Sequence, residues 1–227
     1  CPDHGDFSYL YWDDADAWRR YEAFGVKGSG LANPQVVKDI SSCPYDCGIC
    51  NNHKSTTLLA NVDLTNRCNL NCSFCFANAR ACGYIYEPSY DQIKDMLTIL
   101  RSEKPTPAPA VQFAGGEPTL REDLFEIIRL AKSLGFMQVQ LATNGLILAQ
   151  DPDYALRLKD AGLSTVYLHF DGVSKETNFK LVHDLKAIEN LRKAKQGVVL
   201  VPTIIKGHND HEIGDIVRFA AENIDVI

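Results

Sequence analysis

Three cysteines within eight residues constrain this chain more than any other feature of its sequence. Cys68, Cys72 and Cys75 have C-x3-C-x2-C spacing and follow directly on the strand-like residues 59–65. Three thiolates at this spacing can bind three irons of a [4Fe–4S] cluster, whereas cysteine-ligated clusters usually have four such ligands. The fourth iron would keep an open position for a small molecule. The alternative for the triplet alone is half of a zinc knuckle.

A second motif lies downstream, where residues 113–121 read FAGGEPTLR. Two adjacent glycines, Gly115 and Gly116, allow the backbone to approach a ligand closely. The carboxylate of Glu117 can accept hydrogen bonds from an ammonium group. The alternative is that Glu117 only caps a helix that begins near Leu120. Both motifs in this order favour a cluster over zinc.

The two motifs together resemble the radical S-adenosylmethionine (SAM) superfamily, in which an aromatic residue, here Phe74, precedes the last cysteine. The resemblance implies that Cys68, Cys72 and Cys75 bind the cluster and that its open iron takes the amine and carboxylate of SAM. It further implies that reduction of the cluster cleaves SAM to a 5′-deoxyadenosyl radical. The cofactor supplies this reactivity, and the protein supplies positioning. An electron donor such as ferredoxin or flavodoxin is implied as well.

The resemblance also assigns residues to SAM. The turn of Gly115, Gly116 and Glu117 is expected to hold its amino group. Asn144 is expected near SAM, although an ordinary Asn-Gly turn is the alternative. Asp171 is expected at the ribose hydroxyls, where the alternative is an acidic residue at a helix N-terminus.

The fifth predicted strand is expected to contact the adenine of SAM. Its end carries Thr203, within the run Val-Pro-Thr at residues 201–203. The resemblance places backbone and apolar groups of this run against the base.

From residue 58 onward, short apolar runs alternate with helical patterns, which predicts an α/β fold with a mostly parallel sheet. Strands are predicted at residues 59–64, 111–114, 138–143, 165–170 and 198–204. Helices are predicted at 89–102, 121–134, 154–161, 181–195 and 211–223. Ile227 lies where a sixth strand would begin. This pattern matches the partial (β/α)6 barrel of radical SAM enzymes, and in βα barrels the chemistry lies at the C-terminal ends of the strands.

Residues 1–57 are predicted to form a small, irregular, metal-binding N-terminal region, and residues 58–227 the barrel. A short helix is expected within residues 13–24. The chain begins with Cys1 rather than Met and ends in a strand-like run. We therefore expect it to be a piece of a longer protein, with segments missing at both ends.

A second cysteine triplet lies in the N-terminal region. Cys43, Cys47 and Cys50 repeat the C-x3-C-x2-C spacing, and His53 follows. These residues could form a Cys3His zinc site or an auxiliary [4Fe–4S] cluster, and the spacing favours the cluster. Cys1 begins the sequence Cys-Pro-Asp-His-Gly, which is typical of one half of a metal-binding knuckle. Such a site would bind rubredoxin-like iron or zinc.

Composition narrows the partners and the compartment. The 227 residues are 45% apolar, which allows one sizeable core plus a small lobe. The net charge of −6 gives no indication of the basic surface that nucleic-acid binding requires. No apolar run approaches the ~20 residues of a membrane span. Eight cysteines without an export signal indicate metal rather than disulfides. We expect a cytoplasmic protein, with peripheral membrane contact left open.

The order of all the cysteine motifs resembles one archaeal-centred branch of the superfamily, which includes tetraether lipid synthases and methanopterin-precursor methyltransferases. We therefore expect abstraction of hydrogen from an unactivated C–H bond, with carbon–carbon coupling of lipid chains as the leading reaction. C-methylation of a pterin is the alternative. A third hypothesis is an iron–sulfur electron carrier without catalysis. The Gly-Gly-Glu turn argues against a carrier, which needs no amine acceptor beside an open iron.

Overall fold

The computed structural model describes residues 5, 8, 10, 12–25, 28, 30–33, 53–75, 77, 79 and 83–227. Cys1 and the upstream triplet lie outside these residues, so the metal sites expected there stay predictions. The division of the chain at residue 57 also stays a prediction.

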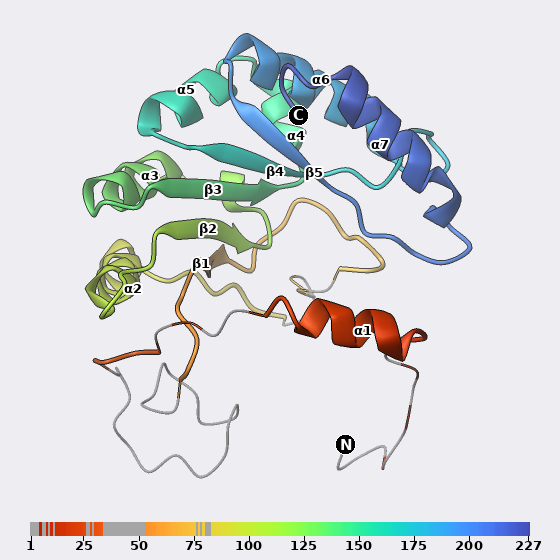
Figure 1. The fold of residues 1–227 in the computed structure, drawn as a ribbon. Coiled ribbons are helices and arrows are strands. Elements are labelled where there is room, and N and C mark those ends of the chain that lie inside the picture. Colours follow the sequence, from red (N-terminus) through yellow and green to blue (C-terminus); the bar gives the residue numbers. More distant parts are fainter. Residues whose placement is uncertain are drawn as a thin grey trace.

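A parallel sheet of five strands forms the centre of the fold, and its order β1-β2-β3-β4-β5 is the order along the chain (Figure 1). The strands are β1 (Leu59–Thr65), β2 (Ala110–Gly115), β3 (Gln138–Thr143), β4 (Thr165–His169) and β5 (Gly197–Val201). Every neighbouring pair is parallel. The predicted fold class, a partial βα barrel, is confirmed.

Helices connect the strands and lie in an arc along one side of the sheet (Figure 1). They are α2 (Tyr90–Ser102), α3 (Leu124–Ser133), α4 (Leu146–Gln150), α5 (Tyr154–Ala161), α6 (Leu181–Lys193) and α7 (Ile213–Glu222). Short 3-10 turns, η1 (Pro118–Leu120) and η2 (Asp210–Glu212), follow β2 and β5. The predicted N-terminal helix is α1 (Ala15–Glu22), which Asp14 caps by accepting from the backbone N–H of Ala17 at 2.8 Å.

Local sequence signals determine several of the helix ends. Ser89 and Gln92 form a capping box at the start of α2. Gly135 ends the α3 segment with φ +92°, a conformation that favours glycine. The α3 segment was predicted to begin at Arg121, but the helix begins three residues later. Arg121 is extended instead, and its buried guanidinium donates to the carbonyls of Leu64 and Pro88 at 2.8 and 2.9 Å.

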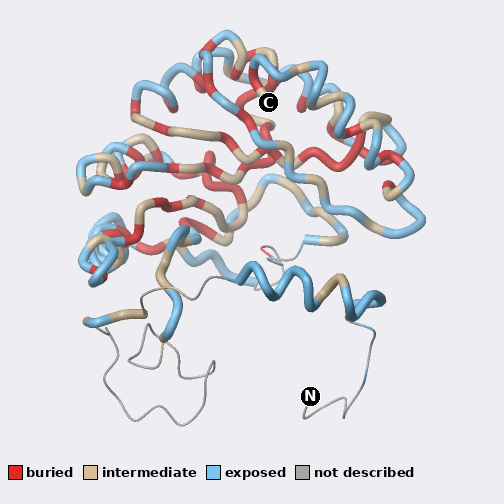
Figure 2. The backbone as a smooth tube through the Cα atoms, in the orientation of Figure 1, coloured by how far each residue is buried: buried red, intermediate tan, exposed pale blue. Residues whose placement is uncertain are grey.

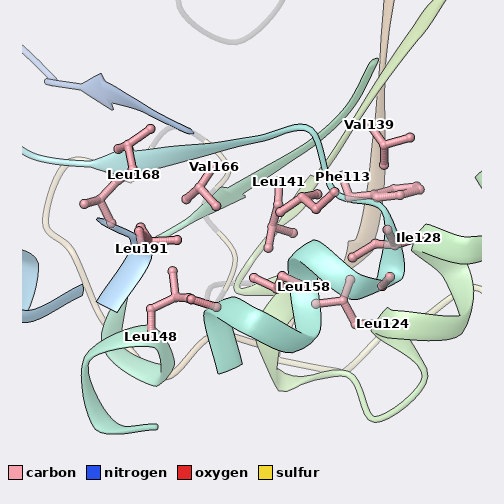
Figure 3. Close-up of a cluster of buried hydrophobic side chains, with 14 of the residues drawn as sticks. Phe113, Leu124, Ile128, Val139, Leu141, Leu148, Leu158, Val166, Leu168 and Leu191 are labelled. Atoms are coloured by element: carbon pink, nitrogen blue, oxygen red, sulfur yellow. The ribbon is translucent and has the colours of Figure 1, made fainter. Parts of the chain in front are cut away.

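The hydrophobic core lies between the sheet and these helices (Figures 2 and 3). It includes the fully buried strand residues Phe113, Leu141 and Leu168, which pack against helix residues such as Leu124 and Leu158 (Figure 3). Burial on this face fixes which side chains of each strand point into the core. The sheet is therefore a rigid frame whose strand ends carry the loops described below.

The predicted sixth strand is not formed among the described residues, since residues 223–226 form a turn. Val226 is buried, and its carbonyl accepts a hydrogen bond from the backbone N–H of Val198 in β5 at 2.8 Å. This bond holds the end of the described chain against β5.

Within the described ranges, every helix falls short of the length and apolarity that a membrane crossing requires.

Candidate functional site

The predicted cluster ligands lie on one loop that leaves the C-terminal end of β1. Cys68 and Cys72 are partly buried and Cys75 is exposed, and none of the three forms a disulfide. The backbone N–H of Leu70 donates to the sulfur of Cys68 at 3.4 Å, and that of Cys75 donates to the carbonyl of Cys72 at 3.4 Å. These local bonds form turns at Cys68 and at Cys72, within the loop that carries all three cysteines.

Electrostatics show that the three sulfurs act on one another. The pKa of Cys72 is raised first by burial and then by the negative charges of Cys68, Cys75 and Asp171, whereas the positive charge of Lys180 lowers it. A thiolate in such a position is stabilised when a cation binds beside it. A cationic iron–sulfur core would satisfy this requirement, so the donor set fits the proposed group.

The described residues contain no group of three His, Cys, Asp or Glu side chains arranged around a single metal ion. In a [4Fe–4S] cluster each cysteine binds a different iron, so the ligands need not surround a single ion.

The Gly-Gly turn braces the start of the cysteine loop. A Cβ atom on Gly115 would lie 2.2 Å from the carbonyl oxygen of Thr65, and one on Gly116 would lie 2.2 Å from that of Arg67. The N–H of Gly116 donates to Thr65 at 2.6 Å, and the N–H of Glu117 donates to Arg67 at 2.8 Å. The glycines therefore allow close approach to this chain's own backbone, directly before Cys68. Their predicted contact with SAM stays a prediction.

Glu117 is buried, and protein donors occupy both of its carboxylate oxygens. One oxygen accepts from the backbone N–H and the hydroxyl of Thr119 at 3.1 and 2.5 Å and from the hydroxyl of Thr143 at 2.7 Å. The other accepts from the N–H of Asn144 at 2.7 Å. Burial raises the pKa of Glu117, and these bonds oppose that rise. The carboxylate caps η1 and joins the ends of β2 and β3, as the capping alternative expects.

Asn144 connects the end of β3 to the cysteine loop. Its side-chain amide donates to the side-chain oxygen of Asn69 at 2.7 Å, and its own side-chain oxygen accepts from the N–H of Leu146 at 3.0 Å. Asn69 stands between the first two cysteines and was not predicted as a site residue. Its position inside the motif was the available signal.

Asp171 lies at the end of β4, and its carboxylate is also engaged. One oxygen is 2.7 Å from Nε2 of His169, and the other accepts from the N–H of Thr203 at 2.9 Å. The side chain of Asn209 donates to the carbonyls of Asp171 and Thr203 at 2.8 and 2.9 Å. The structure thus brings Asp171 and Thr203 together, while their predicted contacts with SAM stay predictions.

Phe74 faces the loop after β5. Its ring centroid is 6.4 Å from that of His208. His53, by contrast, precedes β1, and its ring nitrogen is 3.1 Å from the hydroxyl of Ser55. The neighbouring Thr57 bonds to Glu103 after α2, at the other end of the sheet. The predicted partners of His53, which are Cys43, Cys47 and Cys50, lie outside the described residues, so the role of His53 as a metal ligand stays a prediction.

The family follows from comparison with known proteins. The signature of the radical SAM superfamily matches residues 62–220. Two solved structures share the fold at a TM-score of 0.59: a methylornithine synthase, 18% identical over 74% of this chain and 51% of its own, and Streptococcus suis SuiB, 21% identical over 75% and 38%. The chain belongs to the radical SAM superfamily of enzymes. Membership implies a [4Fe–4S] cluster and SAM as cofactors.

Two relatives show which kinds of enzyme the chain is similar to. A 7,8-dihydro-6-hydroxymethylpterin dimethyltransferase of Methanocaldococcus jannaschii is 52% identical over 100% of this chain and 46% of its own length. A GTP 3′,8-cyclase of Aquifex aeolicus is 33% identical over 70% of this chain and 51% of its own. The chain spans about half the length of these relatives.

Replacing Gly116 with Ala should displace the cysteine loop. The new Cβ would meet backbone atoms of Asn66 and Arg67, which cannot swing aside as a side chain can. We expect a loss of about 1–3 kcal/mol in unfolding free energy and reduced iron content after reconstitution. Gly214→Ala is the control, because a Cβ there meets nothing within 4 Å. Iron content and stability equal to wild type in Gly116→Ala would contradict the bracing role.

Replacing Glu117 with Gln should lower stability. The new amide presents a donor where a carboxylate oxygen now accepts, so a buried donor loses its partner at a cost of about 1–3 kcal/mol. The loss should fall toward the lower end, because a neutral side chain avoids the desolvation of a carboxylate. Urea unfolding of the metal-free protein measures it, with the exposed Glu122→Gln as control. Unchanged stability with weakened SAM binding would instead support the predicted ammonium contact.

Proposed function

We propose that this chain forms the barrel of a radical SAM enzyme that methylates a pterin. The observation that carries the proposal is the 52% identity to a pterin dimethyltransferase, which extends over the whole chain. Pterin methylation was the alternative expected from the sequence. The leading expectation, coupling of lipid chains, has no support among the relatives described above. Membership in a superfamily of enzymes also argues against an electron carrier without catalysis.

We propose that some residues of the site ligate the cluster and that others position the loop that carries the ligands. A [4Fe–4S] cluster with SAM bound supplies one-electron radical chemistry. Cys68, Cys72 and Cys75 would ligate the cluster, and the glycine turn and Asn144 hold their loop in place. Since the chain's own groups satisfy Glu117, we propose that it orients the turn and does not itself carry a proton. The substrate class is a reduced pterin, and the electron donor is a ferredoxin or flavodoxin type of protein.

A product assay tests the substrate class. The full-length protein is reconstituted anaerobically and incubated with SAM, dithionite and either a dihydropterin bearing a hydroxymethyl group or an archaeal lipid fraction. Mass spectrometry should show a pterin heavier by one or more methyl groups, together with 5′-deoxyadenosine. Coupled lipid chains with an unchanged pterin would overturn the proposal. SAM labelled in its methyl group identifies the source of the added carbon.

Each cysteine of the triplet should be indispensable for SAM cleavage. Replacing Cys68, Cys72 or Cys75 with Ala removes one of the three thiolates that the cluster has available on this loop. We expect 5′-deoxyadenosine to fall to background in all three variants, while urea unfolding of the metal-free protein stays near wild type. Ser73→Ala, at an exposed position of the same loop, is the control and should retain SAM cleavage. Near wild-type cleavage in any one cysteine variant would refute the assignment.

A further inference from the structure

The face of the sheet opposite the helices carries polar side chains on β1, β2 and β3. Side chains of a strand alternate between the two faces, and the core residues lie on the face that the helices cover (Figure 1). The alternating positions of β1 are Asn61 and Asp63, which are exposed. Those of β2 and β3 include Gln112 and Gln140, which are partly buried. The open face therefore combines one carboxylate with three side-chain amides.

Strand pairing places these side chains beside one another. Asn61 pairs in register with Gln112, and Gln112 pairs with Gln140. Nε2 of Gln112 donates to Oε1 of Gln140 at 3.2 Å. Asp63 pairs with Ala114, whose small side chain leaves room beside the carboxylate. From the spacing of strands and the rise per residue, the Cα atoms of Asp63 and Gln112 lie about 8 Å apart.

The carboxylate of Asp63 has both oxygens available. Within the described part of the chain, no hydrogen bond or ion pair engages this side chain. The carboxylates of Glu117 and Asp171, by contrast, accept from neighbouring loops. A carboxylate that no loop uses has no bracing role, so Asp63 can accept hydrogen bonds from a ligand.

Asp63 also lies close to the start of the cysteine loop. It precedes Thr65, the last residue of β1, by two residues, which corresponds to about 7 Å along the strand. The carbonyl of Thr65 accepts from the N–H of Gly116 at 2.6 Å, at the turn that follows β2. In βα barrels the chemistry lies at this end of the strands. A ligand at Asp63 would therefore lie beneath the strand end from which the cysteine loop departs.

We propose that Asp63 is a specificity-determining residue that binds the 2-amino edge of the pterin, and that the amide of Gln140 binds its 4-oxo oxygen. The inference rests on the proposed function. In a pterin the 2-amino group and the adjacent N3–H donate in the same direction. A carboxylate accepts such a pair with its two oxygens, as it does from a guanidinium. The bond from Gln112 uses the oxygen of Gln140, so both N–H groups of the Gln140 amide remain as donors.

The same face is unfavourable for a hydrocarbon chain. A lipid tail would remove water from the carboxylate and the amides without replacing their hydrogen bonds, which costs free energy. The polar open face therefore favours a heterocyclic substrate with its own donors and acceptors.

Binding of two matched ligands tests the inference. The full-length protein, reconstituted anaerobically with cluster and SAM, is titrated with 7,8-dihydro-6-hydroxymethylpterin and with its 2-oxo analogue, in which oxygen replaces the amino group. Wild type should prefer the pterin. In Asp63→Asn, pterin binding should weaken about ten- to a hundredfold, because hydrogen bonds to a charged acceptor are lost. Binding of the analogue should not weaken, because the new amide can donate to its 2-oxygen.

Two further variants separate the roles. Asp95→Asn is the matched control and should leave both affinities unchanged, because Asp95 is an exposed aspartate of α2, on the helical side of the sheet. Gln140→Met should weaken both ligands alike, because both carry the 4-oxo oxygen. Wild-type affinities in Gln140→Met would overturn the role of its amide. Iron content and unfolding free energy should stay at wild-type values in Asp63→Asn, because the side chain is exposed and braces no loop.

Other results would overturn the inference in distinguishable ways. Unchanged pterin affinity in Asp63→Asn refutes the role of Asp63, while the proposed function stands if wild type methylates the pterin. An equal loss for both ligands would show that Asp63 does not recognise the 2-amino group. Lost iron or lost stability in Asp63→Asn would show a structural role instead. Wild-type protein that cleaves SAM but binds neither ligand would refute the proposed function and the inference together.

Discussion

The close approach of the β2 turn to the end of β1 is the constraint on which the rest of the site depends. With a Cβ at Gly116, the contact with the backbone of Arg67 could not form, and two short backbone hydrogen bonds would be lost with it. Hydrogen bonds contribute only about 0.5–1.5 kcal/mol each, whereas a backbone clash must displace the chain. Steric fit, more than bonding, therefore decides where the loop of Cys68 begins.

Two buried carboxylates connect the other strand ends along this edge of the sheet. Glu117 joins the ends of β2 and β3, and Asp171 joins the end of β4 to the loop after β5. Both were expected from the sequence to face a ligand. Each uses its oxygens on donors of neighbouring loops, which fixes those loops relative to one another before any ligand binds. Preorganisation of this kind removes an ordering cost from binding.

The sequence predicted the regular elements closely because their signals are local. Apolar runs predicted each strand to within a few residues, and Gly135 marked the end of α3. The helix α4 was missed, since its five residues follow an Asn-Gly pair that reads as a turn. The contacts of Asn69 and the burial of Lys180 could not be predicted either. A lysine four residues before an aspartate reads as an exposed helix pair, and only the tertiary structure shows that it is buried.

The site combines a sulfur-rich loop with a partly exposed cysteine and a support whose polar groups are nearly all satisfied. A cluster carries its own charge, so the protein can influence it mainly through fixed charges and dipoles nearby. A surface lysine would be screened by water and salt. A lysine at 2% exposure, such as Lys180, is not screened in this way and needs an opposite charge beside it. The same burial requires Asp184 as a partner, which explains why the pair occurs as a unit beneath the strand ends.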